Sequence, residues 1–317
     1  MESPHVYQNF KDFICNYLDG ICDSEEQQQK AFLLLKNYTQ FVIKQSRRPY
    51  PFELFHQAIR TPFDFYKFGI DFVSLVIDKQ KSTVSGLENV ELIAKQLALG
   101  ENVILLANHQ TEPDPHIISF LLEPTHAELV SNMIFVAGHR VTTDPLAIPL
   151  SMGCNLLCIY SKKHISYPPK DKSRKVIENQ KTLKKMEELL TEGGKCIFVA
   201  PSGGRDRANT DGVVEVARFD AESIELFRLI ARNSGKPVHF YPLALDTYSL
   251  FPPPKEVEKE IGERRLVQCA PAHIAFGPEL QMEVKETTLS KKDQRQKRAE
   301  IAWIWVSNAY QKLILQK

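Results

Sequence analysis

The chain has 317 residues, of which 43% are hydrophobic and 25% are charged, and its formal net charge is +1. This composition excludes a disordered chain, and the length allows about two domains with a sizeable core. A net charge near zero argues against attraction of the whole molecule to nucleic acid or to an anionic membrane, so any anion site must be a local patch. No apolar run approaches the roughly 18 residues of a membrane span, which argues against an integral membrane protein.

Residues 1–80 predict a small helical N-terminal domain. Ser24 and Gln27 can form a capping box, and apolar residues then recur at helical spacing through residues 23–46. The three prolines that follow break the next segment into short helical pieces. The polar stretch 79–86, "KQKSTVSG", ends in glycine and is the candidate domain boundary.

Residues 87–317 predict an α/β catalytic domain with a mixed, largely parallel sheet flanked by helices. Short apolar runs alternate with helical patterns there, as expected of such a sheet. The candidate strands are "NVILLAN", "MIFVAG", "NLLCIY", "KCIFVAP" and "VHFYPLAL". Residues 173–194 form an amphipathic helix whose final glycines suit a left-handed cap. A last helix is expected over residues 299–315, and the charged run before it, residues 291–298, is expected to be a solvated face.

The six cysteines are scattered, with no CxxC and no paired metal-ligand spacing. We therefore expect small buried thiols in a reducing compartment. The first residues have neither the apolar stretch of a secretory signal nor the composition of an organelle transit peptide. The composition of these first residues favours a protein that acts in the compartment where it is made, or a mature form.

Polar clusters follow four of the predicted strands, at the sheet edge where α/β proteins bind their ligands. Arg205 and Arg207, in "PSGGRDR", carry planar donor groups suited to phosphate oxygens, and the two glycines allow a close backbone approach. Lys163 and His164 add donors from the preceding strand end. Together these side chains predict a site for one small phosphorylated substrate, although a solvated basic loop would look the same.

Other readings of this loop are disfavoured. It is neither a nucleotide P-loop nor a dinucleotide fingerprint, because GxxxxGK[ST] and GxGxxG are absent. Ser202 lacks the GxSxG elbow of a hydrolase nucleophile. The basic stretch 162–175 could instead attract an acidic partner.

Two segments have the spacing HxxxxD: His109 with Asp114, and His139 with Asp144. A histidine oriented by a carboxylate can take a proton from a substrate hydroxyl, which accelerates a reaction by roughly 10²–10⁴. The prolines near each aspartate favour the turn that such contact requires. The two pairs stay nearly tied on the residues alone, and a histidine bonded in a turn remains an alternative for each.

The blocks "NHQTEPDP", "FVAGHRVTTDPLAIPLSMG", "YSKKHI", "APSGGRDR" and "FYPLAL" closely resemble the soluble, plastid-type glycerol-3-phosphate acyltransferases of the HxxxxD glycerolipid acyltransferase group. The resemblance covers most of the chain from about Phe52 onward. It implies a small helical domain followed by a larger α/β domain. The block "APSGGRDR" differs from the FPEGTRS-type block of the wider membrane-bound group.

The resemblance assigns the catalytic roles to His109 and Asp114, and it implies that the spacing at His139 is a coincidence. It assigns phosphate binding to four residues: Lys163, His164, Arg205 and Arg207. The implied activity moves an acyl group from an acyl carrier protein or coenzyme A thioester to the sn-1 hydroxyl of glycerol 3-phosphate. It needs neither a metal nor an organic cofactor, and implies no nucleic-acid partner and at most transient membrane contact.

The implied location is the cytoplasm, as in a bacterial relative, or the plastid stroma if the chain is a trimmed mature form. Three other functions stay open. The acceptor could be lysophosphatidate, the protein could be a non-catalytic module that binds phosphate or lipid, or His109 and Asp114 could be ligands of a hydrolase metal. An acidic carrier protein would suit the basic stretch 162–175 as a docking face.

Overall fold

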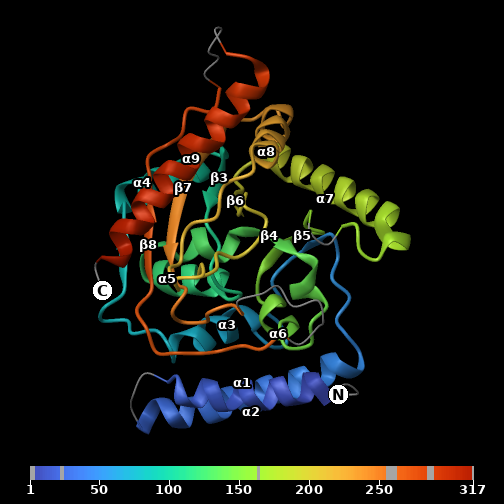
Figure 1. Ribbon diagram of the computed structural model, residues 1–317, viewed down its shortest axis with the longest axis vertical. Coiled ribbons are helices and arrows are strands. Elements are labelled where there is room, and N and C mark those ends of the chain that lie inside the picture. Colours follow the sequence, from blue (N-terminus) through green and yellow to red (C-terminus); the bar gives the residue numbers. More distant parts are fainter. Residues whose placement is uncertain (1–3, 22–24, 163–164, 255–262, 284–288, 316–317) are drawn as a thin grey trace.

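The structure is a computed structural model that describes residues 4–21, 25–162, 165–254, 263–283 and 289–315. Within these residues one eight-stranded sheet has the order β1-β5-β4-β6-β3-β7-β8-β2. Five of its seven strand pairings are parallel, and only β1–β5 and β7–β8 are antiparallel. The prediction of a mixed, largely parallel sheet flanked by helices is therefore confirmed (Figure 1). The strands are β1 (Phe55–His56), β2 (Thr83–Ser85), β3 (Asn102–Ala107), β4 (Ile134–Gly138), β5 (Asn155–Ile159), β6 (Cys196–Val199), β7 (Val238–Asp246) and β8 (His273–Phe276).

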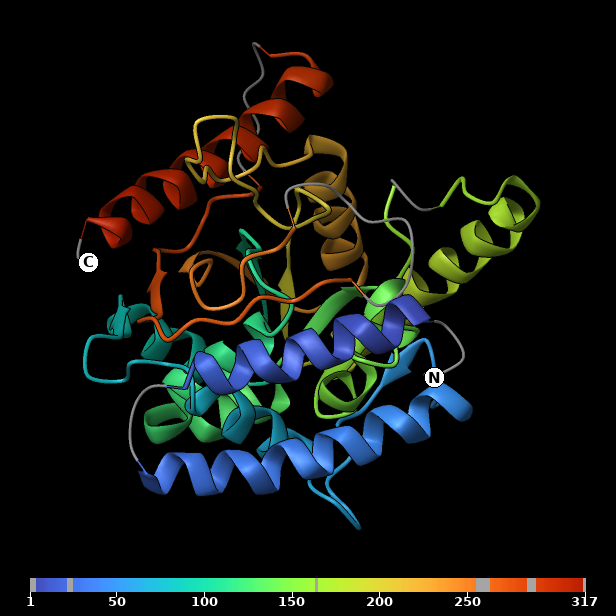
Figure 2. The same cartoon turned by 60° about the horizontal axis from the view of Figure 1, so that its bottom comes forward.

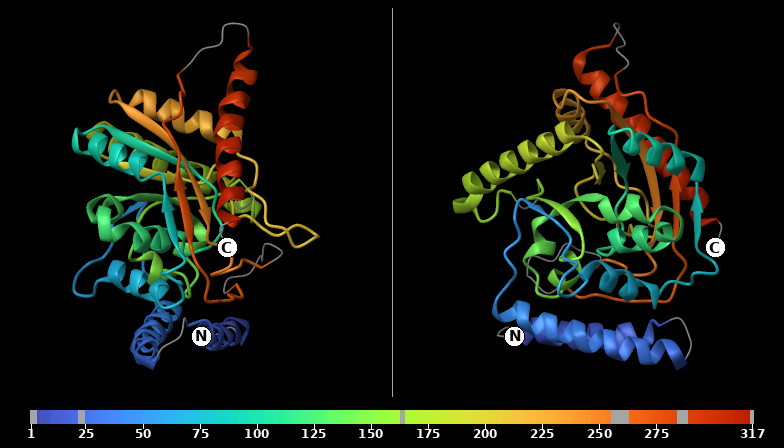
Figure 3. Two further views of the ribbon diagram at one scale, coloured as in Figure 1. Left: turned by 90° about the vertical axis from the view of Figure 1, so that its left-hand side faces the viewer. Right: turned by 180° about the vertical axis from the view of Figure 1, so that it is seen from behind.

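Helices cover both faces of the sheet because its central strands are apolar on both sides. Alternate residues of a strand point to opposite faces. In β3, Val103 and Leu105 lie in a core cluster with α4 (Leu87–Ala98) and α5 (Asp114–Asn132), whereas Ile104 and Leu106 lie in a cluster with the helices of the other face. Those helices are α7 (Lys172–Glu192), α8 (Ala221–Asn233) and α9 (Lys291–Ile314). Figure 3 shows α4 and α9 on opposite sides of the sheet.

The N-terminal helices α1 (Pro4–Asp19) and α2 (Glu25–Arg47) lie side by side across one end of the molecule (Figure 2). A third core cluster joins them to α3 (Phe65–Ser74) and to apolar residues from later in the chain. The Tyr38 hydroxyl donates to the Leu146 carbonyl oxygen at 2.6 Å, just before the short helix α6 (Ile148–Ser151). The strand β1, within the first 80 residues, also pairs with β5. The division into domains 1–80 and 87–317 stays a prediction.

α3 approaches α5 closely at Gly69. A Cβ atom at this position would lie 2.0 Å from Cδ2 of His116, a buried residue of α5. Because real Cβ atoms do not come so near, only glycine allows this contact. None of the helices in the described part of the chain combines the length and the apolar character needed to cross a bilayer.

The structure corrects two expectations and confirms one. The final helix begins at Lys291, because Ser290 caps it by accepting a hydrogen bond from Asp293 N at 3.2 Å and the charged residues that follow are good helix formers. The run 291–298 is mostly exposed, as predicted.

Cys154 and Cys196 are buried thiols, but Cys15 is exposed and Cys269 is disulfide-bonded. Pairing depends on tertiary proximity, which spacing does not reveal.

Candidate active site

His109 and Asp114 are in direct contact at the carboxyl end of β3. The chain leaves β3 after Ala107, turns, and enters α5 at Asp114, directly after Pro113. The distance from His109 Nδ1 to Asp114 Oδ2 is 2.8 Å. The imidazole is 28% exposed whereas the carboxylate is fully buried. The helix N-terminus also favours a negative charge at this position.

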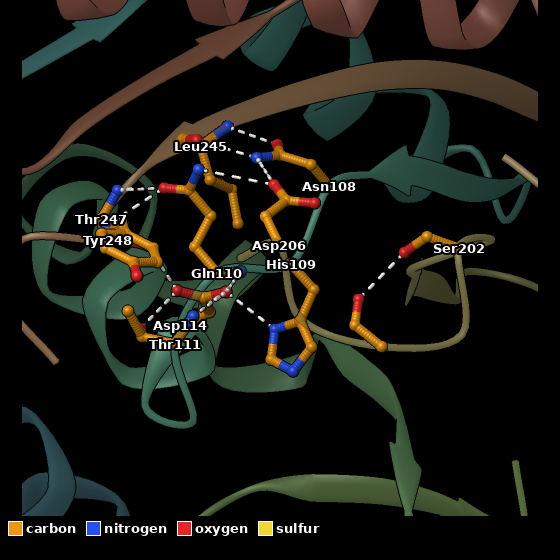
Figure 4. A network of polar contacts seen from close by, with 11 residues as sticks. Asn108, His109, Gln110, Thr111, Asp114, Ser202, Asp206, Leu245, Thr247 and Tyr248 are labelled. Atoms are coloured by element: carbon orange, nitrogen blue, oxygen red, sulfur yellow. Dashed lines mark hydrogen bonds and ion pairs between the residues drawn. The ribbon is translucent and has the colours of Figure 1, made fainter. Parts of the chain in front are cut away.

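Asp114 accepts five hydrogen bonds, which fix its orientation (Figure 4). Its Oδ2 receives the His109 imidazole and the backbone N–H groups of Gln110 and Thr111. Its Oδ1 receives the hydroxyls of Thr111 and Thr247, each at 2.6 Å. Burial acts to raise the pKa of Asp114, but the bonds from His109, Thr111 and Thr247 outweigh it and hold the pKa below its ordinary value. The group is therefore a carboxylate at neutral pH.

An ionised carboxylate at Nδ1 determines which nitrogen of His109 is free to act as a base. The carboxylate only accepts, so Nδ1 carries the proton and the lone pair is on Nε2. Within the residues that the structure describes, no hydrogen bond engages Nε2, and Figure 4 shows this side of the ring pointing away from the polar network. The arrangement can accept a proton from a bound hydroxyl group.

The second HxxxxD segment does not form such a pair. Asp144 lies 3.0 Å from the Arg265 guanidinium and accepts from Leu146 N at 2.9 Å. The His139 ring lies against Tyr160, with ring centroids 4.3 Å apart. His139 lines a pocket of about 350 Å³ whose lining does not include His109. The structure thus separates two segments that spacing alone left tied.

The loop after β6, residues 200–207, lies against the His109 turn, and we call it the arginine loop. The Asp206 N–H donates to the His109 carbonyl oxygen at 2.6 Å. Arg205 Nη2 lies 2.5 Å from Glu263 Oε1, and Arg207 Nε donates to the Pro254 carbonyl oxygen at 3.2 Å. Burial, reinforced by the neighbouring charge of Arg205, lowers the pKa of Arg207. Two cationic groups are thus held on a loop that contacts the His109 turn.

The other predicted site residues have different outcomes. Lys163 and His164 lie outside the described residues, so their role stays a prediction. The Ser202 hydroxyl donates to the Gly204 carbonyl oxygen at 3.0 Å and is turned toward its own loop in Figure 4, not toward His109. Among the residues described, no group of three or more His, Cys, Asp or Glu side chains could hold a metal ion.

Sequence reasoning missed a polar frame around His109. Asn108 donates to Asp206 Oδ2 at 3.0 Å and exchanges two hydrogen bonds with the backbone of Leu245. Gln110 Oε1 accepts from the N–H groups of Thr247 and Tyr248. Thr247 follows directly after β7, so the rule that selected the other strand ends would also have selected it.

A second missed feature is a charged bridge beside the site. Arg265 forms a paired ion contact with Glu112, with Nε–Oε2 and Nη2–Oε1 distances of 2.7 Å and 3.1 Å. Glu112 belongs to the His109 turn, and the same arginine also holds Asp144. Burial acts to raise the pKa of Glu112, but the charge of Arg265 outweighs it and lowers the pKa. The carboxylate of the second HxxxxD segment therefore anchors an arginine.

Residues 81–246, just over half of the chain, match the family model described as Acyltransferase. The glycerol-3-phosphate acyltransferase ATS12, chloroplastic, of Cucurbita moschata is 40% identical over 284 residues, 88% of this chain and 61% of that protein. The chloroplastic glycerol-3-phosphate acyltransferase of Arabidopsis thaliana is 43% identical over 233 residues, 73% of this chain and 51% of that protein. The chain thus spans between half and about three fifths of these relatives. The structure of the 1-acyl-sn-glycerophosphate acyltransferase PlsC from Thermotoga maritima is similar over 78% of each chain, at 18% identity and a TM-score of 0.44.

Proposed function

We propose, from the premise that this chain belongs to the Acyltransferase family, that it transfers a fatty acyl group from a thioester to the sn-1 hydroxyl of glycerol 3-phosphate. The observation that carries the proposal is the 2.8 Å contact between His109 and a buried Asp114, next to a loop with two arginines. Relatives named glycerol-3-phosphate acyltransferases support this acceptor, since they align with most of the chain.

The reaction is a single displacement. Nε2 of His109 takes the proton of the acceptor hydroxyl while the hydroxyl oxygen attacks the thioester carbonyl carbon. Asp114 stabilises the imidazolium that forms. Backbone N–H groups nearby would bind the oxyanion of the tetrahedral intermediate. The carbon–sulfur bond then breaks, and the imidazolium returns its proton to the thiolate. The products are 1-acyl-glycerol 3-phosphate and the free thiol.

The phosphate of the acceptor would bind to Arg205 and Arg207, together with Lys163 and His164. In this structure Glu263 is the anionic partner of Arg205, at 2.5 Å. The substrate phosphate would replace Glu263 as the partner of Arg205, because phosphate oxygens match the geometry of the guanidinium donors. Binding energy from this remote group then holds the hydroxyl against His109.

The acyl donor would be a thioester of an acyl carrier protein or of coenzyme A. An acidic carrier suits the basic stretch 162–175, where Lys170 and Lys172 are exposed. Among the described residues of this stretch, two other cations have partners within the chain. Arg174 pairs with Glu178 at 2.7 Å, and Lys175 donates to the Tyr167 carbonyl oxygen. Charge reversal at Lys170 and Lys172 should raise the KM for the acyl carrier protein, and an unchanged KM would remove this docking face.

The deciding experiment is an acyl-transfer assay on the wild type, His109→Ala and His139→Ala. Activity toward glycerol 3-phosphate should fall by roughly 10²–10⁴ in the first variant, and should stay near wild type in the second. Arg205→Gln should raise the KM for glycerol 3-phosphate. Equal losses in both histidine variants would contradict the role of His109.

Three rivals make different predictions in such an assay. A lysophosphatidate acyltransferase would prefer the already acylated acceptor, so an acceptor panel separates the two. A non-catalytic binding module would show no transfer at all. A chelator should leave the rate unchanged, whereas a metal-dependent hydrolase would lose it. Action in the cytoplasm or in the plastid stroma stays a prediction, to be checked by localising the tagged protein.

A further inference from the structure

Asp206 connects the arginine loop at three points to the turn that carries His109, residues 108–113, which we call the catalytic turn. Its N–H donates to the His109 carbonyl oxygen at 2.6 Å. Its Oδ2 accepts from the Asn108 and Gln110 side chains, at 3.0 Å and 3.4 Å. It therefore bonds to His109 itself and to the residue on each side, and Figure 4 shows the two side-chain bonds. Its own neighbours in the chain are Arg205 and Arg207.

The contacts on the far side of Asp206 leave it little freedom to move. Its Oδ1 accepts from Ala217 N at 2.9 Å. Asn108 is in turn bonded to the backbone of Leu245 at the end of β7, and Gln110 to the backbone of Thr247 just after it. The residue is 1% exposed. The catalytic turn, the arginine loop and the end of β7 thus form one hydrogen-bonded unit with Asp206 at its centre.

The carboxylate is the chemical group that suits this position. Burial raises the pKa of Asp206 to about 6, although the bonds from Ala217, Asn108 and Gln110 act in the opposite direction. At neutral pH the side chain is therefore mostly ionised and accepts at both oxygens. An amide of the same shape would place its NH₂ group against the Asn108 and Gln110 donors or against the Ala217 N–H, and would lose the contact on that side.

We propose that Asp206 is a positioning residue that sets the distance between the His109 imidazole and the guanidinium groups of the arginine loop. It thereby selects acceptors by the spacing between their hydroxyl and phosphate groups. This inference rests on the proposed function, since it assumes that the imidazole meets the hydroxyl and that the arginines hold the phosphate. A misplacement of about 1 Å at such a site costs on the order of 10²-fold in rate.

The test compares two acceptors that differ in spacing alone, 3-hydroxypropyl phosphate and 4-hydroxybutyl phosphate. The first has the three-carbon spacing of glycerol 3-phosphate. The wild type should favour it, by on the order of 10²-fold in kcat/KM, and Asp206→Asn should reduce this preference at least ~10-fold. A defect in folding lowers both rates by the same factor, so it leaves the ratio unchanged.

Asp211→Asn is the matched control, because it makes the same chemical change at an exposed position a few residues further along the chain. It should retain the wild-type ratio. If Asp206→Asn does not fold, Asp206→Glu keeps the carboxylate and lengthens it by one methylene, and it too should lower the ratio. An unchanged ratio in the folded variant overturns the inference alone. A wild type that acylates no phosphorylated alcohol overturns the proposed function and this inference with it.

Discussion

Asp114→Asn separates the charge of the carboxylate from its hydrogen bonds. Asp114 Oδ2 faces three N–H donors, whereas Oδ1 faces the hydroxyls of Thr111 and Thr247. Hydroxyls can rotate and accept, so the introduced NH₂ group should take the Oδ1 position and the amide oxygen should stay on His109 Nδ1. The imidazole then keeps its tautomer and loses only the nearby negative charge.

The loss can be calculated from that single interaction. A hydrogen bond to a charged group contributes about 1.5–3 kcal/mol, and each 1.36 kcal/mol on the barrier changes the rate about tenfold. We therefore expect kcat for acyl transfer to fall about 10- to 150-fold. The fall should be smaller than that of His109→Ala, because the base itself remains. The free energy of unfolding should change by about 1 kcal/mol or less, measured by urea denaturation.

The double variant provides the control. A carboxylate that acts only through His109 has nothing to stabilise when the imidazole is gone. Asp114→Asn should therefore cause no further loss in the His109→Ala background, in steady-state assays with glycerol 3-phosphate. A further loss there, or a kcat for Asp114→Asn within twofold of the wild type, would refute the assignment of Asp114 as the partner of a catalytic base.

Three further predictions concern stability. Gly69→Ala should destabilise the fold by about 1–3 kcal/mol, because its Cβ atom would clash with His116. This loss should outweigh a gain of about 1 kcal/mol in helix propensity. A higher free energy of unfolding in urea titration would contradict the tight contact. Burial lowers the pKa of His116 to about 4, below its value in the unfolded chain. Between these two pKa values only the unfolded chain binds the proton. The free energy of unfolding should therefore be constant above pH ~6.5 and fall by up to about 3 kcal/mol as the pH drops through 4. Urea titrations across this range should give a flatter profile for His116→Leu. Arg265→Met leaves Glu112 and Asp144 without their shared cation and should cost about 3–5 kcal/mol, and calorimetry giving an unchanged melting temperature would count against the bridge.

The central strands were predictable because each is a short apolar run next to a helical pattern. The edges of the sheet were not. β2 lies within the polar stretch that predicted a linker, and β1 has only two residues. Their pairing with β8 and β5 depends on chain segments far away in the sequence, and local composition carries no information about it.

The contact between His109 and Asp114 was predictable, because an imidazole oriented by a carboxylate suits one kind of proton transfer. The spacing rule could not distinguish His109 from His139, because it does not reveal that Asp144 is held by an arginine more than a hundred positions later. Asp206 was overlooked for a related reason. Between two arginines it resembles a solvated acid, and only the fold shows that it is buried against the turn that carries His109.

The position of β3 has a consequence for the dynamics of the site. It lies between β6 and β7, and all six of its residues are buried. Its amide hydrogens should therefore exchange with deuterium only when the whole protein unfolds. The turn that carries His109 follows directly after this slowly exchanging strand. Any movement that opens the site to a long fatty chain must therefore occur in the surrounding loops.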